Sequence, residues 1–237
     1  MRLQREMSPH WRDYEKLITQ IQQVNSDGPY TVLLLSGSFN PVHKMHVQLI
    51  EVAMEHLKKH YARMNVIFGY IAPSSDRYVK GKLKEQAIPL KQRNEMCYLA
   101  TRDSEFIDVY TFGQAYAPAV ADKLREDLTT IYNDPTKFNV LLICGADHCV
   151  RASMWTTPTI CVSRPNDDKK SDQTITQILK NKRANNVHPG FIFVQDERME
   201  NISSTQIRTI IGSGLELPPD FPIHPDVVAY LKKIRYK

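Results

Sequence analysis

The chain has 237 residues, of which 42% are hydrophobic and 24% charged, the balance of a globular protein long enough to bury a sizeable core. No run approaches the roughly eighteen consecutive apolar residues that a membrane-spanning helix needs, and the charged N-terminus lacks the apolar segment of a secretory signal. The net charge of +5 comes from interspersed rather than massed charges. We therefore expect an intracellular protein, cytoplasmic or nuclear, without a membrane or nucleic-acid partner.

The four cysteines, Cys97, Cys144, Cys149 and Cys161, form no CxxC pair. A zinc site built from Cys144, His148, Cys149 and Cys161 would lack the paired short spacings of structural zinc sites. We predict no bound metal and reduced thiols, as is usual inside cells.

Residues 1–25 have apolar residues near helical spacing, which predicts a leading helix and an N-terminal extension over residues 1–29. From there, apolar runs alternate with amphipathic segments. Because the runs are continuous, they predict strands buried on both faces. These strands cover residues 31–36, 66–72, 106–112, 138–144, 159–163 and 191–195. Helices are predicted around residues 47–57, 90–102, 120–131 and 174–184.

Alternating strands and helices predict an α/β fold with a Rossmann-like, doubly wound parallel sheet. No linker divides the chain, so we expect residues 30–237 to form a single domain. Residues 74–88 are polar and lysine-rich, which predicts a long loop. In such sheets the ligand binds beyond the carboxyl ends of the strands, and the chemistry should therefore lie just after the apolar runs.

A first candidate phosphate site, Gly-Ser-Phe-Asn-Pro-Val-His-Lys-Met-His, follows the first strand at residues 37–46. Gly37 allows a tight turn and a close approach of backbone amides to a ligand. His46 falls at the start of the next helix, with His43 three residues before it. The free N–H groups of a helix start favour phosphate, and two imidazoles can donate hydrogen bonds to its oxygens. The spacing fits neither a Walker A loop nor a dinucleotide-binding glycine fingerprint.

A second candidate site, Ile-Ser-Ser-Thr-Gln-Ile-Arg, lies at residues 202–208 before another apolar helical run. Serine and threonine are preferred at helix N-caps. Arg208 falls one turn inside this helix, where its guanidinium can reach a phosphate. The alternative is a capped helix with a surface arginine.

The two motifs together resemble those of the HxGH and SSTxxR nucleotidyltransferase superfamily. The form of the first motif is that of eukaryotic-type nicotinamide mononucleotide (NMN) and nicotinic acid mononucleotide (NaMN) adenylyltransferases, although Met45 stands in the usual glycine position. Further segments are similar to this family in the family order, at residues 72–80, 142–147 and 161–167. The resemblance covers about residues 31–231. The segment between Asp147 and Cys161 is shorter than in the family, and His148 replaces an apolar residue.

The resemblance implies a role for individual residues. The catalytic set would be His46, assisted by His43, with Arg208. ATP would be bound by Gly37, Ser38, Phe39, His46, Ser203, Ser204, Thr205 and Arg208. The mononucleotide or NAD would be bound by Lys80, Phe112, Gly145, Asp147 and Trp155. For Phe112 and Trp155, plain core packing is the alternative.

The implied reaction is transfer of AMP from ATP to NMN or NaMN, with Mg²⁺ accompanying ATP and pyrophosphate leaving. The same phosphate sites would serve an adenylyltransferase acting on phosphopantetheine or flavin mononucleotide. A non-catalytic nucleotide-binding or chaperone protein of the same fold is a further alternative. The sequence leaves homo-oligomerisation open.

Overall fold

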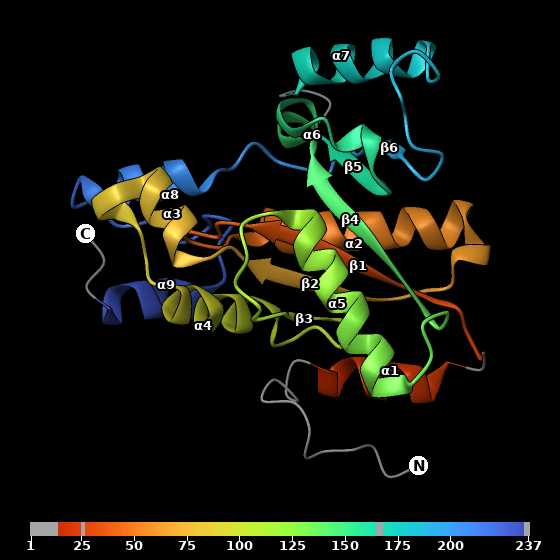
Figure 1. The fold of residues 1–237 in the computed structure, drawn as a ribbon. Coiled ribbons are helices and arrows are strands. Elements are labelled where there is room, and N and C mark those ends of the chain that lie inside the picture. The colour runs from red at the N-terminus through yellow and green to blue at the C-terminus, as the bar shows by residue number, and fades with distance from the viewer. Residues whose placement is uncertain (1–13, 25–26, 165–167, 235–237) are drawn as a thin grey trace.

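The computed structural model describes residues 14–24, 27–164 and 168–234 (Figure 1). Its centre is a sheet of six parallel strands in the order β3-β2-β1-β4-β5-β6. The strands are β1 Tyr30–Gly37, β2 Val66–Pro73, β3 Ile107–Val109, β4 Phe138–Gly145, β5 Thr159–Ser163 and β6 Ile192–Gln195. The strand order reverses between β1 and β4, as in a doubly wound Rossmann-like sheet. The predicted fold class is confirmed.

Two helical layers cover the sheet because alternate strand residues face opposite sides. Leu33 and Ile143 belong to one core cluster, whereas Leu34 and Leu142 belong to the other. The first cluster packs against α2 Lys44–His60, α4 Leu90–Thr101, α8 Ser204–Gly212 and α9 Pro225–Lys233. The second packs against α1 Glu15–Gln23, α5 Ala117–Tyr132, α6 Ala146–Ala152 and α7 Lys169–Lys180.

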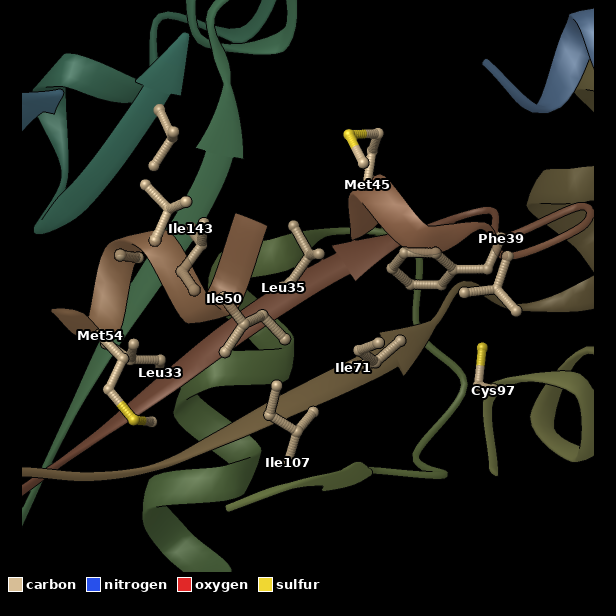
Figure 2. Packing of buried hydrophobic residues seen from close by; sticks show 14 of the residues in the cluster. Leu33, Leu35, Phe39, Met45, Ile50, Met54, Ile71, Cys97, Ile107 and Ile143 are labelled. Atoms are coloured by element: carbon tan, nitrogen blue, oxygen red, sulfur yellow. The ribbon is translucent and has the colours of Figure 1, made fainter. Parts of the chain in front are cut away.

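Helix α2 lies close against the central strands. In Figure 2 its Ile50 points to the sheet near Leu33 and Leu35. A Cβ atom added to Gly69 in β2 would collide with the Ile50 side chain, so a glycine is required where the helix approaches the strand. This contact brings α2 close against the central strands of the sheet.

The predicted strands and helices are all present, with differences at their ends. β3 is shorter than predicted, because this edge strand pairs with β2 only over Gly69–Ile71. α7 begins at Lys169, five residues before the predicted start at residue 174. The first turn of this helix is polar, so the apolar pattern used for the prediction did not reveal it. α1 occupies residues 15–23 of the predicted leading helix, and residues 1–13 and 25 lie outside the described residues. No helix in the described residues is long and apolar enough to cross a membrane.

The prediction of a long loop over residues 74–88 was wrong. The segment folds into α3 Asp76–Leu83 and the short 3-10 turn η3 Lys84–Gln86. Buried Val79 anchors α3, and the Asp76 carboxylate accepts hydrogen bonds from the Leu90 amide at 2.6 Å and from Arg93 at 3.2 Å. Two further 3-10 turns are η2 Ala62–Met64 and η4 Met154–Thr156.

Helix α1 is tied to the sheet by polar contacts as well as by its apolar face. The Lys16 ammonium donates to the carbonyl oxygens of Thr101, Ser104 and Ile107 at 3.1, 2.9 and 3.2 Å. Leu17 is fully buried in the core cluster that α1 shares with α5. The N-terminal helix therefore covers one face of the same sheet.

Candidate active site

The candidate site is a cleft of ≈ 330 Å³ at the carboxyl ends of β1 and β4, where the strand order reverses. Ligands of doubly wound sheets bind at this switch point. Residues from both predicted phosphate motifs line the cleft, although more than 150 residues separate the motifs in the chain. The predicted site residues that line it are Gly37, Ser38, Phe39, His43, His46, Gly145, Asp147, Ser203, Ser204, Thr205 and Arg208.

The first motif forms a tight loop between β1 and α2. Phe39 has a φ of 44°, a left-handed conformation that is uncommon outside glycine, and its ring packs over Gly37, where a Cβ atom would lie 3.1 Å from the ring. The Asn40 side chain holds the loop to a neighbouring segment by accepting from the Ile88 amide at 2.7 Å and donating to the Gln86 carbonyl at 2.8 Å. A conformation that sequence alone disfavours is thereby fixed by its surroundings.

A buried arginine supports this loop from beneath. Arg93, on α4, is fully buried and donates to the Ser38 carbonyl at 3.0 Å and to the Ile88 carbonyl at 2.8 Å. It also forms an ion pair with Asp76 at 3.2 Å. Arg93 was not among the predicted site residues, because nothing in the helical pattern around it distinguishes it from a surface arginine.

The two histidines of the first motif are arranged as one unit at the start of α2. His43 is the N-cap residue, and its backbone N–H donates to Nδ1 of His46 at 3.1 Å. The two rings stack with centroids 3.7 Å apart, and the Phe39 ring meets His46 edge-on at 4.9 Å. Because Nδ1 of neutral His46 is the acceptor, its ring proton must be on Nε2. His46 therefore presents Nε2–H as a hydrogen-bond donor.

Both histidines are neutral at physiological pH. Burial lowers the pKa of His46 from 6.5 to about 3. Burial also lowers the pKa of His43 well below 6.5, and the neighbouring His46 and Arg164 act in the same direction. Nδ1 of His43 is buried and has no hydrogen-bond partner within the described part of the chain. The pair thus offers donors in fixed positions rather than permanent positive charges.

The second motif forms the capped start of α8. Ser203 and Gln206 form a capping box. The backbone N–H of Ser203 donates to the side-chain Oε1 of Gln206 at 2.7 Å, and the backbone N–H of Gln206 donates to Ser203 Oγ at 3.3 Å. The Ser204 hydroxyl donates to the Pro41 carbonyl at 2.8 Å. A direct contact thus joins the helix start to the first motif.

Arg208 connects the same two segments. Its guanidinium donates to the Asn40 carbonyl at 2.9 Å, to Thr205 Oγ1 at 3.0 Å and to Gln86 Oε1 at 3.2 Å. The positive charge is therefore held at the rim of the cleft, one turn inside α8. The amino ends of α2 and α8 both face this region, and each favours negative charge.

The opposite side of the cleft is formed by the turn from β4 into α6. Gly145 is the N-cap of α6, and Asp147 lies in its first turn. A Cβ atom on Gly145 would lie 3.3 Å from Asp147 Oδ1, so glycine leaves room for this carboxylate. A carboxylate there can accept from a ribose hydroxyl. His148 and Lys82, neither of which was predicted as a site residue, also line the cleft.

A second cavity, of ≈ 260 Å³, adjoins the cleft. The residues that line both are Ser36, Gly37, Ser38, Lys82 and His148. The second cavity adds aromatic and basic side chains from other elements, namely Tyr78, Tyr116 and Arg151. The loop of the first motif thus borders two adjoining cavities.

Three predicted residues line neither cavity. Lys80 lies exposed on α3, whereas Lys82 reaches both cavities. Helix positions i and i+2 face different directions, so the phase of α3 decides which lysine faces the site. Phe112 is 41% exposed, which rules out plain core packing. Trp155 packs against the core cluster of the α5 layer.

One further ion pair at the cleft also went unrecognised in the sequence. The Arg164 guanidinium binds the Asp168 carboxylate in a two-point contact, with Nη2 to Oδ1 at 2.8 Å and Nε to Oδ2 at 3.1 Å. Both residues line the cleft. In the chain, Arg164 directly follows β5 and Asp168 directly precedes α7. The available signal was the position of Arg164 directly after the fifth apolar run.

Fold and site together are those of a nucleotidyltransferase, in which the two helix starts predicted to bind phosphate meet over the switch point of a parallel sheet. Residues 34–210 match the family described as cytidylyltransferase-like. The chain is 38% identical over 243 aligned residues to nicotinamide/nicotinic acid mononucleotide adenylyltransferase 1 of Bos taurus, covering 80% of this chain and 83% of that protein. It is 26% identical to the Arabidopsis thaliana enzyme of the same name, with 81% and 84% covered. The chain therefore belongs to the cytidylyltransferase-like family and, more specifically, to the nicotinamide/nicotinic acid mononucleotide adenylyltransferases, which confirms the resemblance.

A solved structure supports the fold. Plasmodium falciparum nicotinic acid mononucleotide adenylyltransferase, complexed with NaAD, superposes with a TM-score of 0.58 at 13% identity, covering 87% of this chain and 96% of the other. At this identity the likeness concerns the fold alone.

Proposed function

We propose that this protein is an adenylyltransferase that transfers AMP from ATP to NMN or NaMN and releases pyrophosphate, so that NAD or its deamido form is the product. The observation that carries the proposal is the direct contact of the two phosphate motifs. Ser204 and Arg208 donate to the carbonyls of Pro41 and Asn40, so one triphosphate can touch both motifs at once. The relatives' activity supports the choice of acceptor.

In the reaction, a phosphate oxygen of the mononucleotide attacks the α-phosphorus of ATP. A phosphorus–oxygen bond forms there, and the bond from the α-phosphorus to the oxygen bridging the α- and β-phosphates breaks. The nucleophile is already anionic at neutral pH, so no general base is required. Catalysis then depends on positioning and on stabilising negative charge. Mg²⁺ enters as part of the MgATP substrate, and we assign it no ligand from the chain.

The geometry suggests a role for each group. Nε2–H of His46 donates to the α- or β-phosphate, where charge develops as the bond breaks. Arg208 and the amino end of α8 with Ser203, Ser204 and Thr205 hold the β- and γ-phosphates from the other side.

The Gly145–Asp147 turn receives a ribose hydroxyl of the dinucleotide. The mononucleotide occupies the adjoining cavity, where Lys82 and Arg151 supply positive charge. Tyr116 lines this cavity and is 66% exposed, so its ring is free to stack against the pyridine base. Lys80, Phe112 and Trp155 stay predictions from the resemblance.

The test is a coupled assay in which NAD formed from ATP, Mg²⁺ and NMN is followed through a dehydrogenase. His46→Ala should lower kcat about 10²-fold or more, on the scale of losing one preorganised donor. His46→Gln should recover part of the loss, because its amide can donate from the place of Nε2. The matched control is His56→Ala, on the same helix but outside the cleft.

Wild-type turnover in His46→Ala would remove His46 from the mechanism. Pyrophosphate release with phosphopantetheine or flavin mononucleotide, but no NAD from NMN, would keep the chemistry and overturn the acceptor. No turnover with any acceptor, despite ATP binding, would favour a non-catalytic nucleotide-binding protein.

A further inference from the structure

Three of the four cysteines meet at one point inside the protein. The Sγ atoms of Cys144, Cys149 and Cys161 all lie within 4.8 Å of one another, and all three residues are buried. They come from β4, α6 and β5. No other group of metal-ligating side chains this compact occurs in the described ranges of the chain.

Strand register produces this convergence. Cys144 and Cys161 are direct partners across the β4–β5 pair, and both belong to the core cluster on the α6 face of the sheet. Cys149 lies one turn into α6, over the same two strands. From their spacing alone, these cysteines and His148 were not expected to bind a metal, because no CxxC turn joins them. Strand pairing brings Cys144 and Cys161 together instead.

The three sulfur atoms have the spacing and chemistry of a metal ligand set. Thiolate–zinc bonds of about 2.3 Å place three sulfurs about 4 Å apart around one ion, which is compatible with sulfurs that all lie within 4.8 Å of one another. Sulfur ligands select soft, thiophilic ions.

We propose that Cys144, Cys149 and Cys161 form a three-thiolate site for a thiophilic ion of the Zn²⁺ class. Cys144 is also among the residues that line the cleft. The site also adjoins the reaction centre, because Cys144 precedes Gly145 and Cys149 follows Asp147 by two residues. An ion there would hold the β4–α6 turn that presents the Asp147 carboxylate.

The test uses the reduced, chelator-treated full-length protein titrated with Cd²⁺, whose thiolate complexes have an ultraviolet charge-transfer band. We expect about one ion per chain, since three sulfurs make one ligand set, together with a raised Tm. Cys149→Ala and Cys161→Ala should each weaken both the band and the binding of Cd²⁺. Cys97→Ala is the matched control, because Cys97 is equally buried but lies on α4 in the opposite layer.

Zinc K-edge absorption of the Zn²⁺-loaded wild type provides a measurement that needs no substitution. It should count three sulfur neighbours. A spectrum with one sulfur or none, absence of the cadmium band, or a band of full intensity and unchanged affinity in Cys149→Ala or Cys161→Ala would overturn the proposal. So would a disulfide within the trio in freshly purified protein, because two of the ligands would then be consumed.

Discussion

The Arg208 guanidinium donates a hydrogen bond of 2.9 Å to the backbone carbonyl of Asn40, a residue 168 positions earlier in the chain. The bond joins the two predicted phosphate motifs directly across the cleft. A planar guanidinium can hold the carbonyl with one nitrogen and Thr205 with another, which a single ammonium group cannot do in the same geometry.

Arg208→Ala should therefore reduce kcat/KM for ATP by about 10²-fold, the scale of losing one charged donor to phosphate. Arg208→Lys should recover only part of this, since it keeps the charge and loses the fork. Steady-state kinetics with varied ATP are the measurement. The control is Arg125→Ala, an exposed arginine of α5 paired with Asp122. Unchanged ATP dependence in Arg208→Ala would show that the residue serves the fold alone.

Acid should destabilise the protein through its two neutral histidines. The pKa of His46 is about 3 in the folded protein against 6.5 in the unfolded chain. Between these values the unfolded chain binds more protons, so the free energy of unfolding falls as the pH falls below about 6.5 and is fully retained above it. Each such histidine contributes at most about 1.4 kcal/mol per pH unit.

Urea unfolding across this pH range measures the effect. His46→Gln and His43→Gln should each show a shallower loss of stability on acidification than the wild type. The exposed His60 gives a control variant, His60→Gln. If the wild type and His46→Gln lose stability in parallel, burial of His46 does not set its protonation.

Arg93 should matter for both stability and ATP binding. Arg93→Met removes the donors to the Ser38 and Ile88 carbonyls and leaves a buried carbonyl without its partner. We expect a loss of about 3 kcal/mol in the free energy of unfolding and a raised KM for ATP, because Ser38 belongs to the phosphate loop. Chemical denaturation and kinetics measure the two effects.

The comparison for Arg93 is Arg102→Met, just beyond the end of α4. Arg102 is about half exposed and pairs with Asp103 and Asp226. Surface pairs contribute at most about 1 kcal/mol, so this variant should stay close to the wild type. Equal losses in the two variants would contradict a special role for the buried arginine.

Lys16 tests whether α1 belongs to the same cooperative unit as the sheet. Lys16→Met removes three hydrogen bonds to carbonyl oxygens and should lower stability by about 1–3 kcal/mol. A single, shifted urea transition by circular dichroism is the expected result. An unchanged midpoint of the urea transition would show that α1 unfolds independently of the rest of the domain, as a separate extension would.

The sequence by itself determined the sheet and the location of the chemistry. Continuous apolar runs specify buried parallel strands, and polar motifs directly after them must lie at one edge. Gly37, His46 and Arg208 could be selected for this reason, because helix starts and strand ends are local features that local patterns encode.

Only the tertiary structure decided which side chains meet. The hydrogen bond from the His43 backbone to Nδ1 of His46 depends on the cap geometry of α2. Which lysine lines the cleft, Lys82 or Lys80, depends on the rotation of α3 about its axis, and the polar composition of this segment did not predict that helix. Arg93 and the cysteine trio depend on packing and strand register. These contacts join residues far apart in the chain, and their geometry is set by the relative placement of whole elements, which no periodicity within one segment records.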